Sequence, residues 1–492
     1  MAKITTIIDI GSNSMRMVVF KKTSRYAFHL INESKLKVKI SEGCYENNGN
    51  LQDLPMQRAY DALKSFLNIA KNLKSRKILC VATSALRDAP NAKLFLNRVS
   101  KELKLNIKVI DGQKEAYYGG VATSNLLECY NFVTVDIGGG STEFAFVKEK
   151  NIVETISLKF GTVRMQELFF NKNDFEGAKN YIIEQIENNK ELFTTYYFLF
   201  TDIVGLGGTA RALSRCVIQN IQYPIDTLHG FTYSVEENKN IFENIVNYKN
   251  KKELKQIGIR KDRYDTIVTG TFIFKTILEY FQVKNVVTSG VGVREGVYLC
   301  DILRTSHHKF PSNFNPSVRS LLDRFVDDQT QSAYLGNNAK KIFGILQPLH
   351  NLDSKYSSIL VIASKLQLIG QSLNFYKTQE NSFWFILNGL NYGFSHQEKV
   401  LISKVAKYSG KALPKEEDIN QFGTLLPCID TIQWLNFMMT LNLTLNIEYG
   451  KVKYDFSLEE NVLKVSSEDK NHLIKNDLIK IKSPEDVILE LD

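Results

Sequence analysis

Two apolar segments, each interrupted by a turn of polar and glycine residues, repeat along the chain. The segment IIDIGSNSMRMVVF begins at Ile7 and TVDIGGGSTEFAFV begins at Thr134, a constant offset of 127 residues. Each copy predicts two strands joined by a tight turn that carries Asp, Gly and Ser. A period of this length is too long for a solenoid and indicates two duplicated domains.

Helical and strand patterns alternate around these hairpins. The stretch MQRAYDALKSFLNIAKNL is amphipathic with helical spacing, and the apolar runs KILCVATSAL and IKVI after it predict strands. A helical region is expected from about Asp174 to Thr194. Two strand–turn–helix units follow, DIVGLGGTARAL from Asp202 and NVVTSGVGVREGV from Asn285. Strands that alternate with helices predict α/β layers in each half.

The last third of the chain has a different pattern. The stretch FPSNFNPSV, with two prolines, predicts a linker, and helical periodicity without glycine-rich turns follows from Ser317 to about Met439. From Leu441 to Ile447 apolar and polar residues alternate, and they do so again after Gly450, which predicts a hairpin. The predicted domains are 1–125 and 126–305 for the two α/β lobes, 317–439 for a helical domain and 440–492 for a small α+β tail.

Composition narrows the function only a little. Hydrophobic residues make up 43% and charged residues 23%, as in ordinary globular proteins, and the formal net charge is +9. A positive excess suits a polyanionic ligand, whether phosphate-rich or nucleic acid, although a lysine-rich surface explains it equally well. Six scattered cysteines predict neither a disulfide framework nor a zinc site. Because no signal-peptide pattern or membrane-spanning run is visible, we expect a cytoplasmic protein.

The acidic residues of the two hairpins are the first candidates for chemistry. Asp9 and Asp136 each end a strand, and if the duplicated domains face each other, both carboxylates meet across one cleft. The main-chain donors of such turns can hold phosphate oxygens, while carboxylates hold Mg²⁺. One Asp of this kind could simply cap its own turn. Two copies at a matching offset favour a shared site.

Five motifs together resemble the successive signatures of the Ppx/GppA family of exopolyphosphatases and guanosine pentaphosphatases. They are DIGSNSMR (Asp9–Arg16), ATSALRDA (Ala82–Ala89), DIGGGSTEF (Asp136–Phe144), GLGGTARAL and GVGVREGV. That family is part of the sugar kinase/actin/chaperone-ATPase superfold. The resemblance implies an α/β fold with a duplicated actin-like (ribonuclease H-like) two-lobed core.

The resemblance also implies a set of site residues. Asp9, Asp136 and Glu143 would place Mg²⁺, with a monovalent cation possible as well, although Glu143 could instead point outward from its strand. Surface arginines and purely structural glycines are the alternatives for several of the implied phosphate-binding residues. These residues are Gly11, Ser12, Asn13, Ser14, Arg16, Arg87, Gly138, Gly139, Gly140, Ser141, Thr142, Gly207, Gly208, Thr209 and Arg294.

For the catalytic base, the resemblance points to Glu115 in the segment VIDGQKEAYYGGV. The family commonly has Ser-Gly-x-Glu-Glu-Ala here, whereas this chain has Asp111 for Ser and Lys114 for the first Glu. A carboxylate at this position would activate the attacking water, and Lys114 could adjust its pKa or contact substrate. A glutamate on a helix surface is the alternative.

The helical domain resembles the HD-type phosphohydrolase domain of longer relatives, but without its metal ligands. Gln367 and Leu368 occupy the position of the His-Asp pair, and Asn381 lies where another histidine would be expected. Since Gln and Leu cannot replace a metal-binding His and Asp, we expect no second metal centre in this degenerate HD-like domain. Binding of a long substrate or dimer contacts are the roles we expect instead.

The leading hypothesis is a hydrolase that removes the terminal phosphate of inorganic polyphosphate, converts pppGpp to ppGpp, or does both. The expected partners are inorganic polyphosphate, guanosine penta- or tetraphosphate and a second copy of the chain, with no membrane and no nucleic acid. Two alternatives are an ATP-dependent small-molecule kinase of the same superfold and a non-catalytic sensor of (p)ppGpp or polyphosphate. The sequence does not rank the two substrates.

Overall fold

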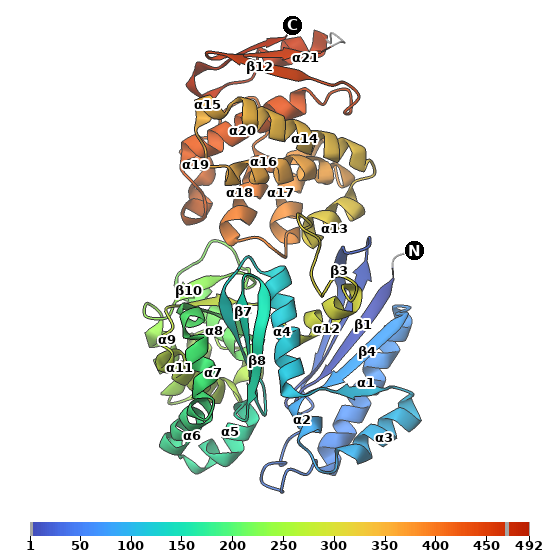
Figure 1. Ribbon diagram of the computed structural model, residues 1–492, viewed down its shortest axis with the longest axis vertical. Coiled ribbons are helices and arrows are strands. Elements are labelled where there is room, and N and C mark those ends of the chain that lie inside the picture. The colour runs from blue at the N-terminus through green and yellow to red at the C-terminus, as the bar shows by residue number, and fades with distance from the viewer. Residues whose placement is uncertain (1–2, 468–471, 492) are drawn as a thin grey trace. The chain divides into compact units, whose positions relative to one another are not determined.

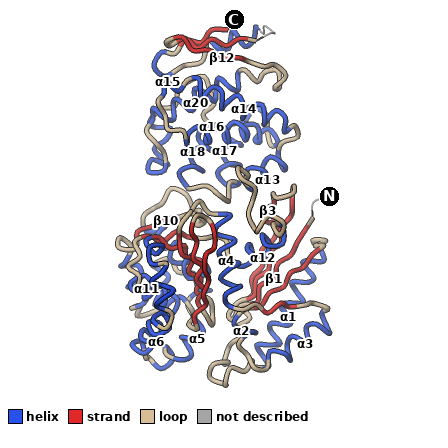
Figure 2. The backbone as a smooth tube through the Cα atoms, viewed as in Figure 1, coloured by secondary structure: helices blue, strands red, loops and turns tan. Residues whose placement is uncertain are grey.

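The computed structural model describes residues 3–467 and 472–491, which fold as two compact units, Met1–Phe314 and Asn315–Asp492. The first unit contains two separate sheets with helices around them, and the second contains a group of helices and a small sheet (Figures 1 and 2). We describe each unit by itself.

The first sheet is formed by five strands in the order β3-β2-β1-β4-β5. Strand β2 is antiparallel to β1 and β3, whereas β4 is parallel to β1 and β5. The elements of this half are β1 (Ile4–Ile10), β2 (Met15–Lys22), β3 (Phe28–Leu36), α1 (Asp53–Asn72), β4 (Lys77–Ala82), α2 (Ser84–Arg87), α3 (Ala92–Leu103), β5 (Ile107–Val109) and α4 (Gly112–Leu126).

The second sheet repeats this order as β8-β7-β6-β9-β11, with β10 added at its edge. The repeated topology confirms the duplicated α/β core. The elements of this half are β6 (Phe132–Ile137), β7 (Thr142–Lys148), β8 (Asn151–Leu158), α5 (Thr162–Leu168), α6 (Phe175–Glu187), α7 (Lys190–Thr195), β9 (Asp202–Leu206), α8 (Gly207–Asn220), β10 (Thr232–Ser234), α9 (Lys239–Val246), α10 (Lys251–Gln256), α11 (Ile267–Tyr280), β11 (Asn285–Thr288) and α12 (Val293–Ile302).

Helix α1 is the amphipathic helix that the spacing of apolar residues predicts. Its buried positions include Ala59, Leu63, Phe66 and Ala70, which recur every three or four residues and therefore lie on one face. Together with residues of β1, β2 and β4 they form the core of the first lobe.

The last helix of each lobe packs on the sheet of the other lobe. A Cβ atom added to Gly120 of α4 would lie 2.9 Å from the side chain of Ile152 on β8, so the helix lies directly against the second sheet. In α12, the ring of Tyr298 stacks on Phe20 of β2 at 4.5 Å between centroids. Figure 1 shows α4 beside β7 and β8, and α12 near β1. The predicted lobes, 1–125 and 126–305, follow the sequence repeat. They assign α4 to the first lobe and α12 to the second, although each helix packs on the sheet of the other lobe.

The second unit is helical, as predicted, and its sheet has the order β12-β13-β14. One core of apolar side chains includes residues from both the helices and the sheet. Its elements are α13 (Pro316–Phe325), α14 (Gln329–Ile345), α15 (Gln347–His350), α16 (Lys355–Leu366), α17 (Thr378–Gly389), α18 (His396–Lys407), α19 (Glu416–Ile419), α20 (Ile429–Thr444), β12 (Asp455–Glu459), β13 (Val462–Ser466), α21 (His472–Leu478) and β14 (Ile488–Leu491).

The prediction of a strand from Leu441 was wrong. Residues 441–444 form the last turn of α20, and the hairpin of the tail is β12–β13 instead. Helix α20 is buried on most sides, and even Asn442 is 0% exposed. A helix that is enclosed in this way carries apolar residues all round, so its period of 3.6 is lost from the sequence.

None of the helices in the described ranges is long and apolar enough to span a membrane.

The exchange of helices predicts a stability effect at Gly296. A methyl group there would collide with the backbone carbonyl of Tyr118, so Gly296→Ala should lower the free energy of unfolding by about 1–3 kcal/mol. Thermal and urea unfolding of the full chain measure this. Gly344→Ala on α14 is the control, because a methyl group there meets no atom within 4 Å and should be neutral or stabilising. An equal change in the free energy of unfolding for the two variants would contradict the close packing of α4 and α12.

Candidate active site

The two predicted turns have the same backbone conformation. The N–H of Gly11 donates to the carbonyl of Ser14 at 3.2 Å, and the N–H of Gly138 donates to the carbonyl of Ser141 at 2.9 Å. These pairs are separated by the same offset as the sequence repeat. Each turn therefore closes a hairpin in the same way, which leaves the N–H groups between them available to an anion.

The two turns lie in contact with each other. A Cβ atom on Gly139 would lie 2.5 Å from Cβ of Ser12, and one on Gly140 would collide with the hydroxyl of Tyr45. The hydroxyl of Ser12 also forms a hydrogen bond with that of Ser84 at 3.0 Å. A side chain at position 139 would separate the turns, and one at position 140 would displace Tyr45 and Ser84, so both positions need glycine.

A cavity of about 160 Å³ opens between the turns and collects most of the predicted residues. It has four arginines in its wall, two of which, Arg211 and Arg263, we did not predict. The predicted residues that line it are Asp9, Gly11, Ser12, Asn13, Ser14, Arg16, Glu115, Asp136, Gly138, Gly139, Gly207, Gly208, Thr209 and Arg294.

The other predicted residues, Arg87, Gly140, Ser141, Thr142 and Glu143, lie behind this lining. The hydroxyl of Thr142 donates to the carbonyl of Phe160 at 2.7 Å, and Glu143 accepts from the hydroxyl of Ser157 at 2.8 Å. Both side chains are buried within the second lobe. In this arrangement they support the second turn.

Glu115 lies in the first turn of α4, and its side chain reaches the cavity. The carboxylate of Asp111 caps this helix by accepting from the N–H of Lys114 at 2.6 Å. Arg87 donates to Glu115 at 3.1 Å through Nη1, and to the hydroxyl of Ser141 at 3.3 Å through Nη2. One guanidinium thus connects the predicted base to the second turn.

Burial raises the pKa of Glu115 well above its usual range, and the nearby Glu143 carboxylate raises it further. The positive charge of Arg87 acts in the opposite direction, while Asp136 and Asp9 add to the increase. The structure places Lys114 differently from Arg87. Its ammonium lies over the ring of Tyr117, 4.3 Å from the centroid.

The two aspartates of the repeat face the same cavity. Burial is the largest cause that raises the pKa of Asp9 to about 6, partly offset by Arg294 and Arg16, and burial also raises the pKa of Asp136. Within residues 3–467 and 472–491, no three acidic, His or Cys side chains are close enough to form a metal site by themselves. Two carboxylates fit a Mg²⁺ ion that takes its other ligands from water and substrate phosphates.

The arginines crowd one side of the cavity. Burial lowers the pKa of Arg16 to about 10, and the charges of Arg294, Arg211 and Arg263 lower it further. Guanidinium groups are suited to bind phosphate oxygens. Arg211 is part of the quoted motif GLGGTARAL, one helical turn after Gly208. Arg263 is the last residue of the short 3-10 helix Lys261–Arg263, where no motif could have identified it.

A further arginine missed from the sequence supports the second turn. Arg164, near the start of α5, donates to the carbonyl of Gly140 at 2.8 Å and to the carboxylate of Asp88 at 2.8 Å. Asp88 in turn contacts Arg87 at 3.3 Å. This chain of charged contacts joins the two lobes beside the cavity.

Comparisons with known proteins agree with this geometry. The model of the Ppx/GppA phosphatase family matches residues 18–305. A guanosine-5'-triphosphate,3'-diphosphate pyrophosphatase of Photobacterium profundum is 26% identical over 406 residues, which cover 81% of this chain and 79% of that protein. A bifunctional 3-dehydroquinate synthase/phosphatase of Fusobacterium nucleatum is 31% identical over 299 residues, covering 57% of this chain and 44% of that protein.

Solved structures resemble about three fifths of this chain. The Aquifex aeolicus Ppx/GppA family member is 28% identical with a TM-score of 0.51, covering 62% of this chain and 100% of that one. An exopolyphosphatase from Cytophaga hutchinsonii shares the fold at 23% identity and a TM-score of 0.56, covering 61% of this chain and 98% of that one. The duplicated turns, the cavity between them and these relatives together show that the chain belongs to the Ppx/GppA phosphatase family.

Proposed function

We propose that this chain is a Mg²⁺-dependent hydrolase of terminal phosphoanhydride bonds, acting on inorganic polyphosphate, on pppGpp or on both. The observation that carries the proposal is the position of Glu115. Its buried carboxylate lines the cavity between the two glycine-rich turns and is held there by Arg87. A carboxylate with a raised pKa beside two anion-binding turns is the arrangement that water attack on a phosphoryl group requires.

The turns and arginines would bind the phosphate chain. N–H groups of the two turns would hold oxygens of the terminal phosphate. Arg16 and Arg294 would neutralise the negative charge that builds up on the leaving phosphate chain as the bond breaks. In the structure Arg294 contacts Glu33 at 3.0 Å, and Arg16 lies 3.9 Å from the same carboxylate. A phosphate would compete with Glu33 for both guanidinium groups.

Glu115 would accept a proton from the attacking water. Asp9 and Asp136 would hold Mg²⁺, which when bound withdraws charge from the phosphate oxygens. As Glu115 takes the proton, the water oxygen would bond to the terminal phosphorus, and the bond from that phosphorus to the bridging oxygen would break. The terminal phosphate would leave with the water oxygen, and the bridging oxygen would stay as an anion on the shortened chain. A sensor would need the same binding groups but no base, and a kinase would need an acceptor pocket with its own base.

The role of Glu115 predicts a large loss of activity without loss of binding. Glu115→Gln should lower phosphate release from pppGpp and from polyphosphate by roughly 10²–10⁴-fold, because a general base is removed while the turns remain. Phosphate release and equilibrium binding, both with Mg²⁺, measure this. Glu176→Gln is the matched control, since Glu176 also lies in the first turn of a helix but is exposed. Full activity of Glu115→Gln would contradict the assignment of Glu115 as the base. If the wild type released no phosphate, the non-catalytic sensor would remain as the hypothesis.

The electrostatics of the site predict a pH effect for Arg87→Gln. Activity should rise with pH as Glu115 loses its proton, and the guanidinium of Arg87 favours the ionised form. Removing that charge raises the pKa of Glu115 further, so the acidic limb of the kcat profile should move to higher pH. Arg98→Gln, on α3 and outside the lining of the cavity, should not move it. If the acidic limb of the kcat profile of Arg87→Gln stayed in place or moved to lower pH, a group other than Glu115 would be responsible for it.

Asp136→Asn should increase the Mg²⁺ concentration needed for half-maximal activity. A charge-assisted contact contributes about 1.5–3 kcal/mol, which corresponds to roughly tenfold or more in the apparent affinity for Mg²⁺. Titration of phosphate release with Mg²⁺ measures the change, with Asp202→Asn as the control at the exposed start of β9. An unaltered Mg²⁺ dependence would remove Asp136 from the metal site.

A further inference from the structure

Two arginines of the phosphate cavity, Arg16 and Arg294, are close to one carboxylate that is not part of its lining. Nη1 of Arg294 donates to Oε1 of Glu33 at 3.0 Å, and Nη1 of Arg16 lies 3.9 Å from the same oxygen. Both arginines line the cavity, whereas Glu33 does not. Glu33 therefore pairs with guanidinium groups that face the expected position of the phosphate chain.

The pairing of β2 with β3 places Glu33 beside Arg16. In this antiparallel pair Arg16 lies opposite Lys35, so Glu33, two residues earlier on β3, is its diagonal neighbour on the same face. Strand β3 is at the edge of the first sheet, and 48% of the Glu33 side chain is exposed. The carboxylate thus meets solvent on one side and the buried guanidinium of Arg294 on the other.

The two guanidinium groups keep donors for a ligand. A guanidinium carries five N–H donors. Among residues 3–467 and 472–491, Arg294 uses one of them, on Glu33, and Arg16 donates no hydrogen bond. Phosphate oxygens could take the remaining donors, but the phosphate would then lie close to the Glu33 carboxylate. The two negative charges repel each other, so phosphate and Glu33 compete for the same pair of arginines.

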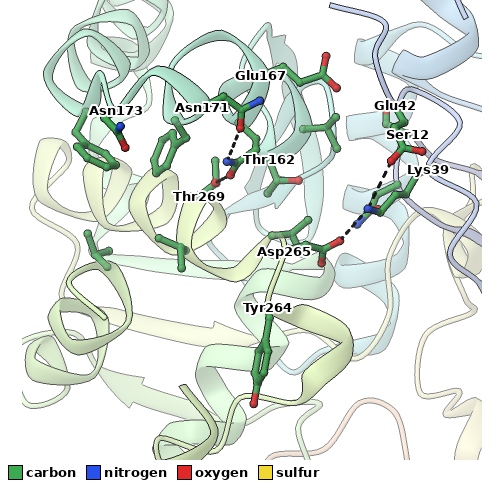
Figure 3. A pocket seen from close by; sticks show the side chains of 18 of the residues that line it. Ser12, Lys39, Glu42, Thr162, Glu167, Asn171, Asn173, Tyr264, Asp265 and Thr269 are labelled. Carbon is green, nitrogen blue, oxygen red and sulfur yellow. Dashed lines mark hydrogen bonds and ion pairs between the residues drawn. The ribbon is translucent and has the colours of Figure 1, made fainter. Parts of the chain in front are cut away.

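Other carboxylates near the first glycine-rich turn have a different kind of partner. Lys39 lies 3.7 Å from Glu42 and 3.7 Å from Asp265, in the wall of a second cavity of about 650 Å³ (Figure 3). Lys39 does not line the phosphate cavity. Glu33 differs from these two carboxylates because both of its partners belong to the candidate active site.

We propose that Glu33 is a built-in competitor for phosphate, which drives the shortened chain away from Arg16 and Arg294 after the terminal phosphate has been cleaved. This inference rests on the proposed hydrolase function and concerns the release of its second product. Because the ion pair of a half-exposed carboxylate is weak, a bound chain separates it, and the pair forms again as the chain leaves. Glu33 in this way lowers the affinity of the site for its product.

Calorimetric titration of the full chain with imidodiphosphate and Mg²⁺ tests the inference without turnover. This analogue of pyrophosphate has nitrogen in place of the bridging oxygen. Glu33→Gln should bind it about three- to tenfold more tightly than the wild type, because a competing charge is removed from both arginines. Glu33→Thr, which suits a strand, should do the same, and thermal unfolding shows whether each variant is folded.

Asp262→Asn is the matched control. Asp262 carries the same charge and is 49% exposed, but it contacts Lys35 at 3.4 Å and Arg260 at 3.6 Å, neither of which lines the phosphate cavity. The affinity of this variant for imidodiphosphate should stay within about twofold of the wild type. Equal tightening in Asp262→Asn and Glu33→Gln would show a general effect of surface charge and would overturn the inference.

Unchanged or weaker binding of imidodiphosphate by Glu33→Gln would also overturn it, since a carboxylate that only holds Arg294 in place for substrate predicts such a loss. During turnover of pppGpp, the inhibition constant of the product ppGpp should fall in Glu33→Gln by the same factor as the dissociation constant of imidodiphosphate. An unaltered inhibition constant would contradict a role in product release. If the wild type releases no phosphate, the hydrolase proposal fails, while the calorimetric comparison still decides whether Glu33 competes with phosphate.

Discussion

The exchange of α4 and α12 between the two sheets determines the geometry of the cleft. Glu115 lies in the first turn of α4, and Arg294 is the second residue of α12. Because each helix packs on the sheet of the other lobe, the base and the arginine are both brought to the line where the two glycine-rich turns meet. Small residues at the helix contacts, such as Gly120 and Gly296, allow the backbones to approach closely enough for this.

The same site concentrates buried charges that are incompletely satisfied. Burial raises the pKa values of Asp9, Asp136 and Glu115, and burial together with the charges of neighbouring arginines lowers the pKa of Arg16. Burying charged groups is costly unless they are paired, so such clusters are typical of sites that bind charged ligands. A phosphate chain would neutralise the arginines, and a divalent cation would neutralise the aspartates.

The sequence predicted those parts of the site that belong to local patterns. The repeated Asp-Ile-Gly turns and the α/β lobes followed from motifs and their spacing, and the resemblance to the family pointed to Glu115, which lines the cavity. The helix exchange did not, because it depends on contacts between residues far apart in the chain. Arg263 ends a short 3-10 helix and Arg164 lies near the start of α5, and neither segment has a distinctive sequence pattern. The last turn of α20 looked like a strand because burial on most sides removes the helical period.

The central claim is that water held at Glu115 attacks the terminal phosphoryl group. Single-turnover hydrolysis of pppGpp in water enriched in ¹⁸O tests it most directly, with the label followed in both products. The account predicts one ¹⁸O atom in the released phosphate and none in the remaining nucleotide. Label in the nucleotide would place the attack at the inner phosphorus, and the absence of any released phosphate would contradict the account.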